Sequence, residues 1–213
     1  FVNWLIKEGR MQVDPLKRLK PLNEKLDRRR IRRALTTEEQ RRLLTTTQAS
    51  TTTRYGLSPS QRCAVYTIAV TTGARANEIK TLERRNIDLI SQTLTIRATN
   101  AKNQTDATLS LPGWACELIA PALAEGLPNS RPFGALRRQF YMIAEDMEAA
   151  GIEPTDANGA TVDFHALRAT FITGLARAGV PLTVAQKMAR HSDPALTANA
   201  YTHLRMADYQ IAT

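Results

Sequence analysis

The segment Val162–Arg168 combines helix-start signals with two side chains that can bind a phosphate group. Asp163 is a favourable N-cap, and Val162 before it can form a hydrophobic staple. His165 and Arg168 are three residues apart, so they lie on one face of the predicted helix. His165 also falls in the first turn, where unpaired backbone amides and the helix dipole favour an anion. The alternative is an arginine that caps a neighbouring helix and a histidine that is hydrogen-bonded in the core.

Arg75 is a second candidate phosphate ligand. It follows a glycine that is predicted to end a helix, in the order Thr72-Gly73-Ala74-Arg75. Glu78 lies three residues further on, where its carboxylate can hold the guanidinium in one orientation. Taken alone, a pair of this kind is usually a surface salt bridge that contributes little energy.

The C-terminal part of the chain contains a candidate nucleophile. Tyr201 follows His191 by ten residues and is itself followed by Thr202 and His203. A phenol with a pKa of about 10 is ionised to roughly one part in a thousand at pH 7, so a cationic neighbour or a histidine base would have to activate it. Considered alone, Tyr201 is an ordinary amphipathic surface tyrosine.

The elements that must position these side chains are mainly helices. A capping box at Thr36 and a serine cap followed by proline at Ser58 predict two helix starts, and Gly73 predicts a left-handed helix end. Alternation of β-branched and polar residues predicts a hairpin with a polar tip. The predicted fold class is therefore mainly α with a small antiparallel β-sheet (α+β). The predicted helices cover residues 1–9, 36–47, 58–73, 76–82, 113–125, 134–150, 164–178, 182–190 and 195–203, and the strands cover 93–97 and 108–111.

The distribution of positive charge points to a polyanionic partner. The 213 residues carry a net charge of +9, and the pI is about 10.0. Between Lys17 and Arg42 lie eleven basic and four acidic residues, which is +7 of that total. A charge run is by itself more often a solvated linker or a targeting patch. Nucleic acid is therefore favoured without being established by charge alone.

Composition excludes several other classes of protein. An apolar fraction of 43% is enough for a packed core, and no apolar run approaches the roughly 18 residues that a membrane span needs. Cys63 and Cys116 cannot form a disulfide framework or a metal quartet, so we expect two buried thiols in a reducing compartment. The sequence also contains no acidic cluster that would hold a divalent metal.

In their order along the chain, these motifs resemble the catalytic domain of the tyrosine recombinases, the phage-integrase family. The order is an arginine after Thr-Gly, a lysine on a hairpin tip, His-x-x-Arg at a helix start, and a histidine followed ten residues later by Tyr-Thr-His. The resemblance covers nearly the whole chain and implies the tyrosine-recombinase catalytic fold. Carried over position by position, it places catalytic residues at Arg75, Lys102, His165, Arg168, His191 and Tyr201, with Glu78 supporting the first arginine.

The resemblance also implies a domain organisation and shows one departure. Residues 1–13 correspond to the last helix of a core-binding domain, 14–35 to a basic interdomain linker, and 36–213 to a catalytic domain with a C-terminal tail. Many members have glycine before the second histidine, whereas this chain has Arg190, which adds a charge near the site. Lys102 is the one lysine of a tip whose length varies in the family.

The activity that the resemblance implies is site-specific cleavage and rejoining of double-stranded DNA through a 3′-phosphotyrosine, in recombination or integration. Two guanidiniums would hold the non-bridging phosphate oxygens, and Lys102 would protonate the 5′-oxygen. Neither cofactor nor metal is expected. The partner is DNA, on which a protein that is monomeric when free would form a tetramer, in the cytoplasm of a bacterium or encoded by a phage or other mobile element. The expected DNA-backbone contacts are Arg28, Arg29, Arg30, Arg32 and Arg33.

Three alternatives remain open from sequence alone. The turn Ala178-Gly179-Val180 between two predicted helices suits a helix-turn-helix regulator or a relic recombinase that only binds DNA. A metal-dependent nuclease could use His165, His191 and His203 with Asp163 or Asp193, although none of these pairs has the close helical spacing of common metal motifs. A type IB topoisomerase would share the same covalent chemistry.

Overall fold

The structure, a computed structural model, describes residues 1–19, 31–98, 106–191, 194–195, 197–198 and 201. Its contacts divide the chain into two compact units, Phe1–Ile31 and Arg32–Thr213. In the first unit, helix α1 (Val2–Lys7) ends earlier than predicted, and the chain turns at Gly9 with φ 67°. The side chain of Trp4 stacks on Phe1 and lies 5.7 Å from the guanidinium of Arg10.

In the second unit, local signals set the bounds of the first two helices as predicted. Helix α2 (Thr37–Ala49) begins with the capping box of Thr36, whose hydroxyl accepts from the Glu39 amide at 3.1 Å. Helix α3 (Pro59–Thr72) begins with Ser58 as its cap and ends at Gly73, which is left-handed with φ 64°. Almost every residue of α3 is buried, because the helix packs against α2, α5 and α7.

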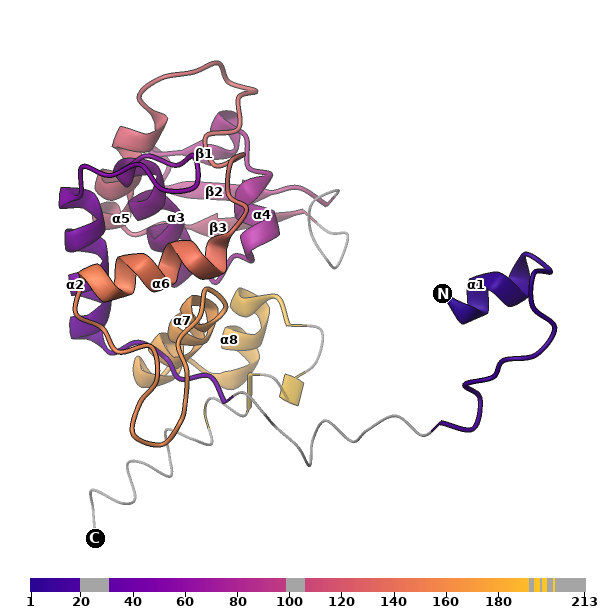
Figure 1. The fold of residues 1–213 in the computed structure, drawn as a ribbon. Coiled ribbons are helices and arrows are strands. Elements are labelled where there is room, and N and C mark those ends of the chain that lie inside the picture. Colours follow the sequence, from indigo (N-terminus) through magenta and orange to yellow (C-terminus); the bar gives the residue numbers. More distant parts are fainter. Residues whose placement is uncertain (20–30, 99–105, 192–193, 196, 199–200, 202–213) are drawn as a thin grey trace, which may run out of the picture. The chain divides into compact units, whose positions relative to one another are not determined.

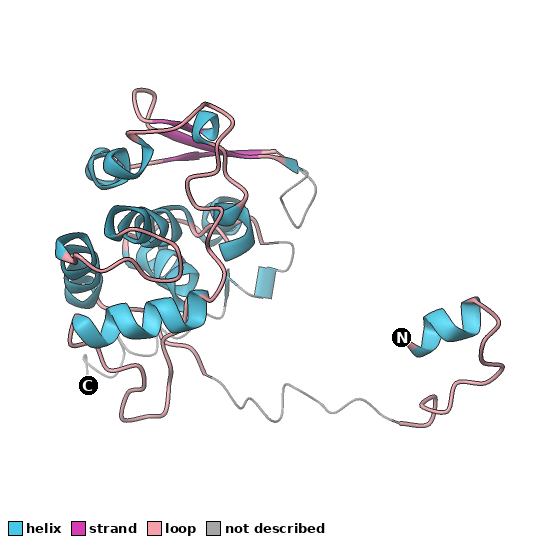
Figure 2. Cartoon of the chain, turned by 45° about the horizontal axis from the view of Figure 1, so that its top comes forward, coloured by secondary structure: helices cyan, strands magenta, loops and turns pink. Residues whose placement is uncertain are grey.

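A small sheet follows the short helix α4 (Ala76–Lys80) and one turn of 3₁₀ helix (Arg84–Asn86). Strands β1 (Ile87–Asp88), β2 (Thr93–Ile96) and β3 (Ala107–Ser110) form an antiparallel sheet in the order β1-β2-β3. The predicted hairpin of β2 and β3 is confirmed, and β1 adds a strand that the sequence did not predict. The sheet forms a layer along one side of the helices (Figure 2).

The two helices that follow are shorter than predicted. Helix α5 (Gly113–Ile119) passes into a 3₁₀ turn (Ala120–Leu123) at Pro121, which lacks the N–H that a continuing α-helix needs. Helix α6 (Gln139–Ala149) was predicted to begin at residue 134, which is wrong. Successive turns occupy residues 131–136 instead, because they bury both Phe133 and Leu136 in the core.

Helices α7 and α8 lie close to three candidate site residues: Arg168 is in α7, His165 directly precedes α7, and His191 follows the end of α8. Helix α7 (Ala166–Arg177) begins two residues later than predicted, so its N-cap is His165 and not Asp163. Asp163 lies in the turn before the helix, where its Oδ1 accepts from the Ala166 amide at 2.9 Å. Helix α8 (Leu182–Ala189) follows a short turn and lies beside α7 (Figure 1). The stripe predicted on α7 is only half confirmed, because Phe164 and Leu167 are buried while Phe171 and Leu175 are partly exposed. The helix predicted at 195–203 lies largely outside the described residues.

One core unites α2, α3, α5, α6 and α7 with one face of the sheet. Both cysteines are buried and unpaired, as predicted, and burial raises the pKa of the Cys63 thiol to about 11. Within the described ranges, the structure contains no helix that is long and apolar enough to cross a bilayer.

Candidate active site

The turn that ends α3 places Arg75 at the start of α4. Gly73 has a positive φ of 64°, and a Cβ at this position would lie 2.6 Å from Cδ1 of Phe171. Glycine is therefore required here both by backbone conformation and by the close approach of α7. Two residues later, Arg75 is the N-cap of α4, with its side chain 27% exposed.

The carboxylate of Glu78 holds Arg75 and a second arginine together. Its Oε1 accepts from Nη1 of Arg75 at 2.9 Å, and its Oε2 accepts from the Arg75 backbone amide at 2.8 Å. Oε2 also accepts from Nη2 of Arg190, at 3.0 Å. Because Glu78 is buried and fully engaged, its carboxylate fixes both guanidiniums in direction.

The guanidinium of Arg168 connects three segments of the chain. The side chain is buried, Nη1 donates to the carbonyl of Gly73, and Nη2 donates to the carbonyl of Ala189 at the end of α8. Burial, followed by repulsion from Arg75 and Arg190, lowers the pKa of Arg168 to about 10. The group stays charged at neutral pH, and two carbonyl contacts leave other N–H donors of the five available for a ligand.

A cavity of about 330 Å³ gathers the predicted phosphate ligands. Arg75, His165 and Arg168 all line it, together with Arg32 and apolar and polar groups of α6 and the α7 start. The remaining lining residues are Ala74, Ala76, Gln139, Phe140 and Phe164. Residues that are 93 positions apart in the sequence, Arg75 and Arg168, therefore meet at one concave site.

His165 lines this cavity and has a face exposed to solvent. The surrounding protein lowers the pKa of its imidazole below the ordinary value. The main cause is desolvation, which disfavours the charged form, and the cations Arg32, Arg168 and Arg75 add to it. Asp163 opposes the shift. The imidazole is therefore neutral at pH 7 and can accept a proton.

Arg32, which the sequence predicts as a DNA-backbone contact in the basic run, also lines the cavity. Its Nε donates to Oδ2 of Asp163 at 2.7 Å, and its side chain is 37% exposed. Its position depends on a parallel β-bridge between Arg32 and Thr161, 129 residues apart in the sequence. No local pattern could have revealed this placement.

The remaining predicted residues lie elsewhere or outside the described part. His191 Nδ1 lies 2.8 Å from the hydroxyl of Thr197, and Tyr201 donates its hydroxyl to the carbonyl of Val180 at 2.5 Å. Neither side chain is among the described residues that line the cavity. Desolvation raises the pKa of Tyr201, which favours the protonated phenol.

Of the predicted DNA contacts and the general acid, only two residues can be located. Lys102, Arg28, Arg29 and Arg30 lie outside the described residues. Arg33 makes two hydrogen bonds of 2.8 Å to the carboxylate of Glu39, so in this conformation it fastens the chain to α2. Its contact with DNA stays a prediction.

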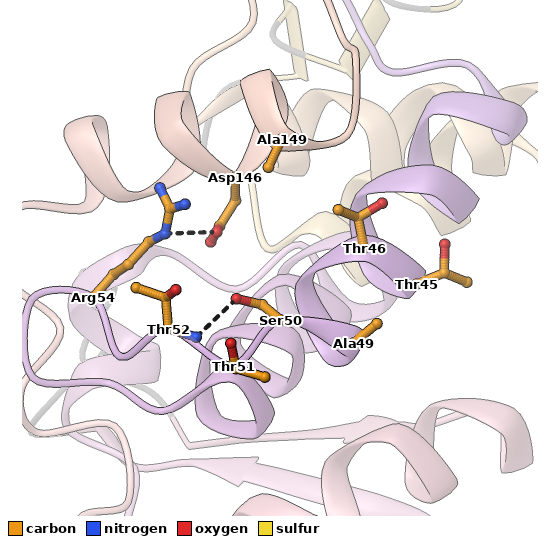
Figure 3. A pocket seen from close by; sticks show the side chains of 9 residues that line it. All are labelled: Thr45, Thr46, Ala49, Ser50, Thr51, Thr52, Arg54, Asp146 and Ala149. Atoms are coloured by element: carbon orange, nitrogen blue, oxygen red, sulfur yellow. Dashed lines mark hydrogen bonds and ion pairs between the residues drawn. The ribbon is translucent and has the colours of Figure 1, made fainter.

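A second and larger hollow, of about 620 Å³, lies between the end of α2, residues 50–54 and α6. Figure 3 shows its lining of threonines and small side chains, with Arg54 reaching toward Asp146. No predicted site residue lies there. In the part of the chain that the structure describes, no three His, Cys, Asp or Glu side chains are grouped so that they could hold a metal ion, and His203 and Asp193 lie outside that part.

Comparisons with known proteins place the chain in a family. Residues 33–208 match the model of the phage integrase family. Among curated proteins, y4gC of Sinorhizobium fredii is 28% identical to this chain over 145 residues, which cover 63% of this chain and 72% of that protein. Its name describes it as an integrase/recombinase.

Solved structures of recombinases share the fold. XerA recombinase is 18% identical with a TM-score of 0.64, over 100% of this chain and 73% of that chain. XerH recombinase in a post-cleavage complex with difH is 18% identical with a TM-score of 0.67, over 92% and 56%. The catalytic domain of bacteriophage HP1 integrase is 22% identical with a TM-score of 0.58, over 81% and 88%.

The family match spans the second unit except Arg32 and its last five residues, and it includes every described lining residue of the cavity other than Arg32. None of the alternative functional classes is better supported by these matches. The protein therefore belongs to the phage integrase family of tyrosine recombinases, and it is a site-specific DNA recombinase.

Proposed function

We propose that the protein cleaves and rejoins DNA by covalent catalysis, with Tyr201 as nucleophile and the cavity of Arg75, His165 and Arg168 as the phosphate site. The convergence of two guanidiniums and a neutral imidazole on one cavity carries this proposal. The phenolate oxygen of Tyr201 bonds to phosphorus, the bond from phosphorus to the 5′-oxygen breaks, and that oxygen leaves with the electron pair and takes up a proton. The 3′-phosphotyrosine conserves the energy of the broken ester, so rejoining needs no other energy source.

The guanidiniums stabilise the charge that builds on the non-bridging oxygens. Arg75 is held in direction by Glu78, and Arg168 by two backbone carbonyls, so neither has to reorganise when the phosphate arrives. By analogy with oxyanion-hole donors, each contributes roughly 3–4 kcal/mol to the transition state. A guanidinium also binds two phosphate oxygens with a geometry that an ammonium group cannot reproduce.

Proton transfer falls to three further residues. His165 is neutral at pH 7 because its pKa is lowered, so it can accept a proton or donate a hydrogen bond at the reacting phosphate. Lys102 is the proposed general acid for the 5′-oxygen, and His191 is proposed to assist at the phosphate as its sequence motif implies. General acid catalysis of this kind typically contributes about 10²–10⁴-fold.

DNA is the substrate, and recombination requires two duplexes to be held together. The XerH structure is described as a complex with a palindromic difH substrate after cleavage. We propose for this chain a tetramer assembled on DNA, formed from a protein that is monomeric when free. The basic linker of residues 14–35, with Arg28, Arg29 and Arg30, supplies backbone contacts in this proposal.

The test is covalent trapping on a nicked suicide duplex without added metal, followed by mapping of the modified peptide. We expect the wild-type protein to form an adduct at Tyr201, and Tyr201→Phe to bind DNA with unchanged affinity but form none. Tyr141→Phe, a change at a tyrosine 65% exposed on α6, is the matched control and should form the adduct at the wild-type rate. Adduct formation by Tyr201→Phe would overturn the assignment, and a wild-type protein that only shifts DNA would be a binding module.

A further inference from the structure

Arg190, at the end of α8, combines a buried side chain with an unusual backbone conformation. It is the helix C-cap with φ 54° and ψ 43°, a left-handed conformation that costs a non-glycine residue roughly 1–2 kcal/mol. Its side chain is only 6% exposed, and Nη2 donates to Oε2 of Glu78. Its Nε and Nη1 are buried without a hydrogen-bond partner among the described residues. Strain, burial and unused donors together are costly for a residue that serves only as a helix cap.

The charges around Glu78 do not balance. Three guanidiniums, those of Arg75, Arg168 and Arg190, influence one another beside this single carboxylate, so the cluster carries 3 − 1 = +2. Repulsion from Arg190 is one of the causes that lower the pKa of Arg168. A buried excess of positive charge favours the arrival of an anion, and a phosphodiester carries one negative charge that grows at the transition state.

The geometry also links Arg190 to the direction of Arg75. Glu78 Oε1 accepts from Nη1 of Arg75, and Oε2 accepts from both the Arg75 backbone amide and Nη2 of Arg190, so the two side chains hold opposite oxygens of a carboxylate that the amide also anchors. Without Arg190, Oε2 would keep the Arg75 backbone amide but lose its second donor, so the carboxylate would hold the Arg75 guanidinium less firmly. Arg190 therefore acts on the cavity through Glu78, to which it is hydrogen-bonded across 112 residues of sequence, and not by direct contact.

We propose that Arg190 is a positioning residue for DNA cleavage: through Glu78 it fixes the guanidinium of Arg75, and its charge strengthens the attraction for the scissile phosphate. The proposal rests on the proposed function, because it assumes that Arg75 contacts that phosphate. Arg190 is the position at which many members of the family have glycine, and the proposal gives the arginine of this chain a role there.

The first test is Arg190→Gly, since glycine adopts the left-handed conformation without strain and should leave the fold intact or more stable. At saturating DNA we expect single-turnover adduct formation to fall about 10- to 100-fold, while DNA affinity changes less than about threefold. Arg190→Lys should recover part of the rate, because it restores the charge but not the forked contact. Arg85→Ala removes the same charge from an exposed ion pair with Glu83 and should keep the wild-type rate.

The second test separates positioning from general damage. In a Glu78→Gln background, Arg190→Gly should cost much less than in the wild-type background, because the carboxylate that transmits its effect has been removed. Equal losses in the two backgrounds would overturn the proposal. Arg190→Asn, which also tolerates the left-handed conformation, repeats the measurement if the glycine variant unfolds.

The outcomes distinguish this proposal from the proposed function. A wild-type protein that forms no adduct overturns the function itself. A wild-type protein that forms the adduct, with Arg190→Gly forming it equally fast, overturns only the role of Arg190. Inorganic phosphate gives a readout that needs no chemistry: it should raise the Tm of wild type and Arg85→Ala equally, and that of Arg190→Gly less.

Discussion

Two clusters of arginines and carboxylates lie at different places in the second unit, and they differ in charge balance. The Asp146 cluster joins α3, α6 and residues 50–57, and its two arginines face two carboxylates, so its charge is 2 − 2 = 0. The Glu78 cluster at the cavity carries 3 − 1 = +2. The members are Arg54, Arg62, Glu145 and Asp146 in the first, and Arg75, Arg168, Arg190 and Glu78 in the second.

Their hydrogen bonding differs in the same sense. Arg62 is fully buried and donates to Asp146 at 2.8 Å and to the carbonyls of Thr52 at 2.7 Å and Leu57 at 3.2 Å. Tyr66 donates its hydroxyl to Asp146 at 2.7 Å. Arg54 Nε has no hydrogen bond among the described residues but lies 3.5 Å from Oδ1 of Asp146, whereas Arg190 in the Glu78 cluster keeps two buried donors, Nε and Nη1, without a hydrogen-bond partner there.

The comparison teaches that charge balance separates a scaffold from a site better than cavity size does. The hollow beside the Asp146 cluster is the larger, at about 620 Å³ against about 330 Å³, yet its charges satisfy one another. A cluster whose charges balance stabilises the packing of α3 on α6. A cluster with excess positive charge keeps binding capacity for an anion, at a cost in stability that the rest of the fold offsets.

The largest effect is expected from a substitution that removes one charge from the balanced Asp146 cluster. Arg62→Met leaves the Asp146 carboxylate buried without its main partner, so the free energy of unfolding should fall by about 3–5 kcal/mol in urea titrations. Arg62→Met combined with Asp146→Asn should recover part of that loss, because no uncompensated charge remains. Arg85→Ala should lose less than about 1 kcal/mol. A loss below that of Arg85→Ala would show that the cluster is not a scaffold.

The next prediction concerns the Glu78 cluster, where a substitution should lower the reaction rate and leave stability almost unchanged. Arg75→Lys keeps the charge but cannot grip two phosphate oxygens, so adduct formation on the suicide duplex should fall about 10²–10³-fold. Its free energy of unfolding should change by less than about 1 kcal/mol, because lysine keeps a positive charge beside the buried carboxylate of Glu78 and the Arg75 side chain is itself 27% exposed. Arg54→Lys makes the same replacement in the Asp146 cluster and should leave the rate unchanged. Near-wild-type cleavage by Arg75→Lys would argue against the phosphate clamp.

A smaller effect tests the turn that joins α3 to the Glu78 cluster. Gly73→Ala combines a positive φ with a contact of 2.6 Å to Phe171, whereas Gly159→Ala has a positive φ of 76° and no atom within 4 Å. Both changes carry the left-handed cost, so the excess destabilisation at Gly73 should be about 1–3 kcal/mol from overpacking. Adding Phe171→Leu should reduce that excess. Equal melting temperatures for the two glycine variants would remove the close approach as a constraint.

The smallest expected effect is on pH dependence. His165 has a folded pKa below its ordinary value of 6.5, so the unfolded chain binds the proton more readily. Stability is therefore lost as pH falls through 6.5 toward the lower folded pKa, and adduct formation should decline over the same range as the base becomes protonated. His165→Gln should flatten the stability difference between pH 7.5 and pH 5.5, whereas the small destabilisation by Arg85→Ala, in an ion pair with Glu83, should be the same at both. An unchanged slope in His165→Gln would assign the dependence to another group.

Sequence reasoning predicted what local chemistry determines. The caps at Thr36 and Ser58, the left-handed glycine at Gly73 and the β2–β3 hairpin all follow from short patterns, and each is present. The start of α6 was wrong because Phe133 and Leu136 bury themselves through turns that only the packed core stabilises.

For the candidate site, the sequence predicted residue types in the right order but not every contact. Arg75, His165 and Arg168 do line one cavity, as the motif order implies. The placement of Arg32 depends on pairing with Thr161, and that of Arg190 on Glu78, so both rest on contacts more than 100 residues apart in the sequence. Such contacts leave no periodic or spacing signal.

The hydrogen bond from Tyr201 to the Val180 carbonyl bears on the order of events in the proposed reaction. A net hydrogen bond of about 1 kcal/mol keeps the phenol oxygen occupied in roughly four molecules of every five. If Tyr201 is the nucleophile, its oxygen has to leave this carbonyl before it attacks, so the binding of DNA must offset that small bias.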